Sequence, residues 1–274
     1  MLPGYSCFFY KEKIMKTFWL TSLGAYQDVV NGLMSKMKTY GLKVNGHFWE
    51  DNLKQLAWMA AKDNLTDSTT SFWAILGSEE ELLSPDLRYG LSLLAIITQA
   101  KRGLNFPIVI LQTHGTLIPT DQLPTPLKGA DILLLSDSGI GAKLVAKAHQ
   151  TSQPISHEYF IDIYGDAHIG QWFEIRPFNS TWLGAMFGVH GGEIAFHGVG
   201  PFGELPSKSI LNYPMKGLRL DLKGKEYIAW AVKNKLDAET SYYVKIDGFP
   251  DSILFGPFPT EGEDEADVHV LELK

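Results

Sequence analysis

Residues 71–111 read SFWAILGSEEELLSPDLRYGLSLLAIITQAKRGLNFPIVIL, and this stretch decides the class of fold. A short, continuously apolar run at 71–77 is followed by a long apolar helical pattern at 86–102 and a second apolar run at 106–112. Two strands joined through a helix form a parallel pair, because a crossover connection returns the second strand in the same direction. Apolar runs without polar alternation indicate a sheet that is covered on both faces.

The same alternation of strands and helices continues on both sides of this unit. Apolar runs predict further strands at 16–21, 42–49 and 131–135, and helical spacing predicts helices at 25–40, 52–62 and 139–149. Together these patterns predict an α/β domain that is doubly wound, with a five-stranded parallel sheet of the flavodoxin type.

After Pro154 the sequence changes to short runs in which apolar and polar residues alternate, separated by Gly and Pro. These runs read EYFIDIYG, QWFEIRP, GAMFGV, EIAFHGV, LRLDLKG, SYYVKIDG, ILFGPF and VHVLEL. A period of two is typical of strands, so we expect a mostly β, sandwich-like second domain. The run at 225–235, KEYIAWAVKNK, fits either a hairpin strand or a helix.

We therefore expect a flexible N-terminal extension at 1–15, an α/β domain at 16–150 and a mostly β domain at 155–274, with the two domains folding separately.

The formal net charge is −7 and no cluster of Lys and Arg occurs, which argues against general binding of nucleic acid. Cys7 is the one cysteine, so no internal disulfide can form, which fits a cytoplasmic protein. No apolar run is long enough to predict a membrane helix.

Polar residues and glycines follow three of the predicted strands, at the strand ends where α/β folds bind ligands. We expect six of them to line any site there, and they are Ser22, Ser78, Glu79, Ser138, Gly139 and Gly141. Glu79 is the candidate catalytic carboxylate, and Ser138 is placed to cap the following helix beside an anion. The alternative interpretation is ordinary: tight turns between strand and helix, and acidic residues that the helix dipole favours in a first turn.

Two further motifs are weaker. His190, Glu193 and His197 are residue types that bind zinc or iron, but they lie in predicted strands and turns that face different ways, so we expect no metal site. The run from Gly198 to Gly203 matches G-x-G-x-x-G, but its Pro201 is unsuited to the helix that a dinucleotide site requires. We therefore predict no bound cofactor.

The order of elements over 16–150, and the stretch at 71–111 in particular, resemble the Toll/interleukin-1 receptor (TIR) domain family. That resemblance implies a self-associating signalling module, and some members of the family cleave NAD with a glutamate in an S-x-x-C-x-x-E-like arrangement. Here Ser84 matches the serine, Leu87 replaces the cysteine and Gly90 stands at the glutamate position.

Two functions follow as hypotheses. The first is a cytoplasmic, non-catalytic recognition or signalling module that binds a protein partner or itself. The second is a nucleotide-processing hydrolase or transferase that acts on an N-glycosidic bond, with a nucleotide-like ligand at the strand ends of the first domain.

Overall fold

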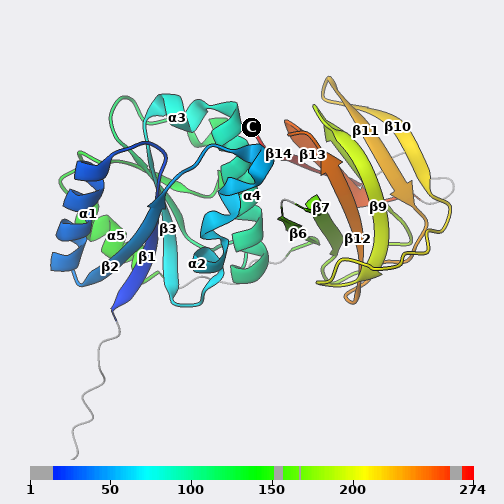
Figure 1. Cartoon of the computed structure of the whole chain (residues 1–274), viewed down its shortest axis with the longest axis horizontal. Coiled ribbons are helices and arrows are strands. Elements are labelled where there is room, and N and C mark those ends of the chain that lie inside the picture. Colours follow the sequence, from blue (N-terminus) through cyan, green and yellow to red (C-terminus); the bar gives the residue numbers. More distant parts are fainter. Residues whose placement is uncertain (1–14, 151–156, 167, 260–266) are drawn as a thin grey trace, which may run out of the picture.

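The structure, a computed structural model, describes residues 15–150, 157–166, 168–259 and 267–274. The first half contains a parallel sheet with the strand order β2-β1-β3-β4-β5 (Figure 1). Its strands are β1 (Lys16–Ser22), β2 (Leu42–Phe48), β3 (Thr70–Gly77), β4 (Ile108–Gln112) and β5 (Asp131–Leu134). The five-stranded parallel sheet that the apolar runs predict is thus confirmed.

Helices cover both faces of this sheet because successive residues of its strands point to opposite faces and are apolar on each of them. Phe18 and Leu20 of β1 pack with α1 (Gln27–Thr39) and α5 (Ile140–Ala148), whereas Trp19 faces the other layer. The helical elements of that other layer and of the connections are α2 (Lys62–Thr66), α3 (Glu79–Leu83), α4 (Pro85–Arg102), η3 (Thr120–Gln122) and η4 (Thr125–Leu127).

The helix expected at 52–62 is wrong in its type. The chain forms two short 3₁₀ helices there, η1 (Leu53–Gln55) and η2 (Ala57–Ala61), before α2 begins. Leu56 separates them with a left-handed backbone conformation, φ 55°, which a continuous α-helix excludes. The predicted apolar stripe of Leu53, Leu56, Ala57 and Ala60 is wrong as well, because Ala60 is exposed and the buried residues are Leu53, Trp58 and Ala61.

The second half consists of two antiparallel sheets, so its mostly β character is confirmed (Figure 1). The sheet β6-β7-β12-β9 contains β6 (Tyr159–Asp166), β7 (Gly170–Pro177), β9 (Glu193–Pro201) and β12 (Thr240–Asp247). The sheet β10-β11-β8-β13-β14 contains β8 (Ala185–His190), β10 (Met215–Leu222), β11 (Lys225–Val232), β13 (Ser252–Pro257) and β14 (His269–Glu272). The ambiguous run at 225–235 is therefore mainly a strand.

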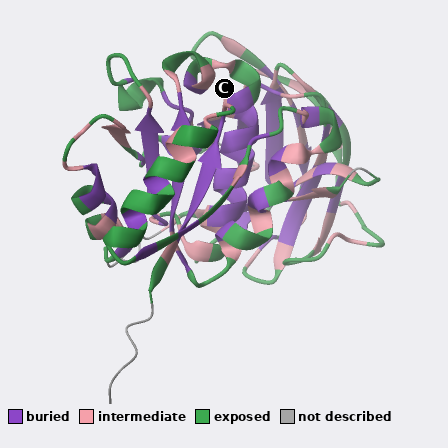
Figure 2. Cartoon of the chain, turned by 60° about the vertical axis from the view of Figure 1, so that its left-hand side comes forward, coloured by how far each residue is buried: buried purple, intermediate pink, exposed green. Residues whose placement is uncertain are grey.

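Helix α4 lies between the two halves, and the burial in Figure 2 is concentrated in this helix and in the strands on either side. Tyr89 of α4 accepts a hydrogen bond from Gln171 Nε2 at 2.6 Å. Ser92 Oγ donates to the carbonyl oxygen of Leu273 at 2.9 Å. One hydrophobic cluster accordingly includes residues of both halves.

Candidate functional site

The loops after β1 and β3 meet where the winding of the sheet changes direction, which is the usual ligand crevice of such folds. Here the side chain of Glu81 occupies that place. Its Oε2 accepts hydrogen bonds from the Tyr26 hydroxyl at 2.8 Å and from the Ser78 backbone N–H at 2.7 Å. Burial, and then the bond to Glu81, raise the pKa of Tyr26, so the phenol is a neutral donor at neutral pH.

The predicted residues after β1 and β3 have structural roles nearby. Ser22 is buried and its Oγ donates to the carbonyl oxygen of Gly24 at 2.8 Å. Ser78 caps α3 in a capping box, in which its Oγ accepts from the Glu81 N–H at 3.2 Å. Glu79 is exposed in the first turn of α3, where the helix dipole favours a carboxylate.

The predicted residues after β5 are arranged differently from the expectation. Ser138 is exposed and does not cap α5, so that prediction is wrong. Gly139 takes the cap position, and its N–H donates to Asp137 Oδ1 at 2.7 Å, which places the chain's own carboxylate before the helix. A Cβ on Gly141 would lie 2.5 Å from the Tyr40 ring, so this glycine makes room for packing between α1 and α5.

Gly90, the position that the TIR resemblance assigns to a glutamate, is buried inside α4. A Cβ there would lie 2.7 Å from Cζ2 of Trp49 and 3.2 Å from Cβ of Trp58. The indole of Trp49 thus fills the space that a side chain at this position would need.

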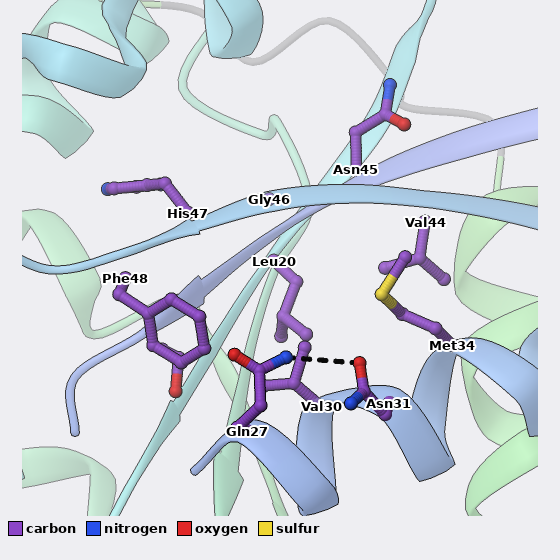
Figure 3. A pocket seen from close by; sticks show the side chains of 11 residues that line it. Leu20, Gln27, Val30, Asn31, Met34, Val44, Asn45, Gly46, His47 and Phe48 are labelled. Atoms are coloured by element: carbon purple, nitrogen blue, oxygen red, sulfur yellow. Dashed lines mark hydrogen bonds between the residues drawn. The ribbon is translucent and has the colours of Figure 1, made fainter. Parts of the chain in front are cut away.

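The strand ends do border one open site, between α1 and the edge strand β2. This cavity of about 190 Å³, called the α1–β2 pocket below, is shown in Figure 3. Its walls come from β1, α1 and β2, and they consist of Leu20, Ser22, Gln27, Val30, Asn31, Met34, Val44, Asn45, Gly46, His47 and Phe48. Of the predicted site residues, Ser22 lines this pocket and the other five do not.

Successive side chains of β2 point to opposite sides of the strand, and this determines which of them face the α1–β2 pocket. The side chains of Val44 and Phe48 point toward α1, whereas those of Asn45 and His47 point to the other side of the strand (Figure 3). Between them Gly46 lies opposite Leu20 of β1, and a Cβ on Gly46 would collide with the Leu20 carbonyl oxygen. The pocket floor therefore carries no side chain at Gly46, and the ring of Phe48 stays 43% exposed beside it.

The walls of the α1–β2 pocket are uncharged. None of its lining residues is Asp, Glu, Lys or Arg, and burial lowers the pKa of His47 to about 4. The Nδ1 of His47 also accepts a hydrogen bond from Trp19 Nε1 at 3.0 Å, which protonation of that nitrogen would break. The polar groups nearest α1 are amides, with Gln27 Nε2 donating to Asn31 Oδ1 at 3.1 Å. Such walls suit an apolar or amide-bearing group and offer no counter-charge to phosphate.

The weaker motifs lie apart from this pocket. His190 Nδ1 contacts the Glu226 carbonyl oxygen, and His197 Nδ1 contacts the Tyr242 hydroxyl. Within the part of the chain that the structure describes, no three metal-ligand side chains come together. Gly198 and Gly200 belong to strand β9 rather than to a loop before a helix. No helix among the described residues has the length and apolarity needed to cross a membrane.

The second half also contains functional candidates that the sequence pattern did not single out. Asp162, Glu174 and Arg176 share one face of β6 and β7, and all three are buried. In the sequence these charged residues alternate with apolar residues, a pattern that predicts a strand face exposed to solvent.

Comparison with known proteins adds no identity: no protein-family model matches the chain, and no curated protein is similar to it in sequence.

Proposed function

We propose that this protein is a non-catalytic recognition module that binds an extended segment of a partner protein along β2, with an apolar side chain in the α1–β2 pocket. The observation that carries the proposal is the uncharged wall of that pocket beside an edge strand. A nucleotide brings phosphates that need cationic or N–H partners, whereas a peptide side chain brings apolar surface.

The edge of β2 supports the same occupant. Among the described strands β2 pairs with β1 alone, so one side of its backbone is open to a further strand. Edge strands are usually protected by prolines, bulges or several charges, and β2 has one lysine, Lys43, as its protection. A partner that adds a strand gains main-chain hydrogen bonds, and a neighbouring pocket then selects one of its side chains.

Selection from a library of random peptides displayed on phage tests the proposal. Wild-type protein is expected to enrich peptides that share an apolar residue, and their binding is expected to slow amide hydrogen exchange in residues 42–48. Asn31→Trp places a large ring over the pocket from an exposed helix position and is expected to abolish the enrichment. Lys36→Trp adds the same ring to the same helix outside the pocket lining and is expected to preserve it. Equal enrichment by both variants, or none by the wild type, would contradict the proposal.

The enzymatic alternative predicts that the protein cleaves NAD, whereas the recognition module that we propose does not. Cleavage of NAD needs a carboxylate that can stabilise the cation formed as the glycosidic bond breaks. Gly90 has no side chain, and both the Tyr26 hydroxyl and the Ser78 N–H already donate to Glu81. We expect no release of nicotinamide when the purified protein is incubated with NAD and analysed by chromatography. Release that disappears in Glu79→Gln would instead support the hydrolase.

A further inference from the structure

A second cavity of about 240 Å³ lies between the C-terminal end of α4 and strands β6 and β7, and we call it the interdomain pocket. We propose that it binds a small carboxylate with a flat, apolar body, and that Arg176 holds the carboxylate. The proposal concerns a different part of the molecule from the α1–β2 pocket and does not depend on it.

Arg176 is a buried cation that forms no ion pair with any residue that the structure describes. It is 7% exposed and lines the interdomain pocket. Its Nη1 donates to the carbonyl oxygen of Pro177 at 2.9 Å, but its buried Nε has no hydrogen-bond partner. Aromatic rings enclose the guanidinium, whose carbon lies 4.8 Å from the ring centre of Phe160 and 4.2 Å from that of Phe202. A guanidinium stays protonated in proteins, so this positive charge is buried at a cost that an anion would offset.

The carboxylates nearest in the sheet already have other partners. Glu174 Oε1 accepts from the Gly203 N–H and the Tyr243 hydroxyl, both at 2.9 Å, and its Oε2 accepts from the Tyr164 hydroxyl at 2.6 Å. Asp162 forms an ion pair with Lys101 of α4 at 2.9 Å. Neither carboxylate forms an ion pair with Arg176. The charge of Glu174 acts on the guanidinium through space, but it occupies none of the guanidinium's hydrogen-bonding positions.

The lining of the interdomain pocket selects the ligand class. No lining residue is acidic, and the walls combine Arg176 with aromatic and aliphatic residues. They consist of Ile96, Gln99, Ala100, Gly103, Leu104, His157, Tyr159, Phe160, Ile161, Arg176 and Phe178. The Nε edge of a guanidinium is a planar fork that matches the two oxygens of a carboxylate. Rings on the walls favour a flat apolar body behind that carboxylate, and the volume limits it to about one ring.

Calorimetric titration of the full-length protein with benzoate tests the proposal, with benzyl alcohol as the neutral compound of the same shape. We expect saturable binding of benzoate at concentrations up to about 10 mM, where a ligand with a millimolar dissociation constant is nearly saturating. Benzyl alcohol is expected to bind at least about tenfold more weakly, because it cannot make charge-assisted bonds to Arg176.

Two pairs of variants locate the binding. Arg176→Lys keeps the charge and removes the fork, and it is expected to raise the dissociation constant of benzoate about tenfold or more. Arg219→Lys is the matched control on the exposed strand β10. Ala100→Leu fills the interdomain pocket from α4 without altering Arg176, and Ala146→Leu is its control at an exposed position of α5.

Thermal unfolding of each variant identifies any that fail to fold, and Ala100→Leu then carries the test independently of Arg176. Loss of binding in Ala100→Leu, with binding kept in both controls, supports the proposal. It is overturned if folded wild-type protein shows no saturable binding of benzoate, if benzyl alcohol binds equally well, or if Ala100→Leu binds benzoate as the wild type does.

Discussion

Gly90 lies within α4, where the absence of a side chain leaves room for the indole of Trp49. Glycine in a helix interior costs about 1 kcal/mol relative to alanine, so replacing it is favourable where space exists. Gly32 of α1 is such a position, because a Cβ there meets no atom within 4 Å. Gly90 thus has a steric reason to be glycine, whereas Gly32 has none.

We expect Gly90→Ala to lower the free energy of unfolding by about 1 kcal/mol, because overpacking against Trp49 costs about 1–3 kcal/mol and exceeds the gain in helix propensity. Gly32→Ala is the control and is expected to raise it by about 0.5–1 kcal/mol. Urea denaturation measures both. Stabilisation by Gly90→Ala would show that the space beside Trp49 is open, and would reopen the question of a carboxylate at this position.

Two histidines, the partly buried His47 and the buried His197, predict how stability depends on pH. Burial lowers the pKa of His47 to about 4, and burial with the nearby charge of Lys216 lowers that of His197 to about 4. The unfolded histidine has a pKa of about 6.5, so between about pH 6.5 and 4 the unfolded chain binds protons that the folded chain does not. Stability contributed by these neutral rings is therefore present above that window and is lost as the pH falls through it.

We expect the free energy of unfolding to fall with decreasing pH in this window, by at most about 1.4 kcal/mol per pH unit for each histidine. His47→Gln keeps an acceptor for Trp19 and removes the titration, so it is expected to reduce the slope. Urea denaturation at a series of pH values provides the measurement. A slope unchanged in His47→Gln would mean that this ring does not titrate as described.

At the scale of elements, α4 depends on a contact with a strand far along the chain. Ser92 is fully buried and its Oγ donates to the Leu273 carbonyl oxygen just after β14. Ser92→Ala leaves that oxygen without this donor, so we expect a loss of about 1–3 kcal/mol in the free energy of unfolding. Ser35→Ala, at an exposed position of α1, is expected to change it by less than about 0.5 kcal/mol. Equal effects of the two variants in urea denaturation would contradict the assigned contact.

Most elements could be predicted from local patterns, because apolar runs and helical spacing record which faces are buried. The capping box of α3 is readable as well, since Ser78 and Glu81 have its spacing. The region around Leu56 could not be predicted, because its left-handed conformation leaves no mark in the spacing of apolar residues. The sequence predicts Ser138 as a cap, but the neighbouring Asp137 supplies the acceptor instead.

The candidate sites were less predictable than the elements. The sequence predicts Ser22 at a site, and Ser22 lines the α1–β2 pocket. The pocket itself depends on Gly46 and on the packing of α1 beside the edge strand, which the sequence pattern does not reveal. Arg176 follows the apolar Ile175 in a strand with period two, and this pattern predicts an Arg176 side chain exposed to solvent. It is buried because Phe202, from the segment after β9, packs over its guanidinium.

At the scale of the whole molecule, α4 joins the halves through Tyr89, Ser92 and Lys101, which contact Gln171, Leu273 and Asp162 respectively. We expect a chain cut at a protease site inserted between Gln150 and His157 to elute as one complex in size-exclusion chromatography under native conditions. The apolar cluster shared by both halves supplies the reason. Elution of two separate fragments, each still folded, would show that the contacts of α4 do not hold the halves together and would favour independent domains.

The position of α4 has a consequence for the chain as it leaves the ribosome. Ser92 is separated from its partner Leu273 by 181 residues. At translation rates of about 5–20 residues per second, roughly 10–40 s pass between the synthesis of the helix and that of the strand that covers it. During that interval the side of α4 that later contacts the second half has no cover from β14, and its apolar residues are open to other nascent chains or to chaperones. This protein is therefore expected to depend on protection during its synthesis, in the interval before β14 has been made.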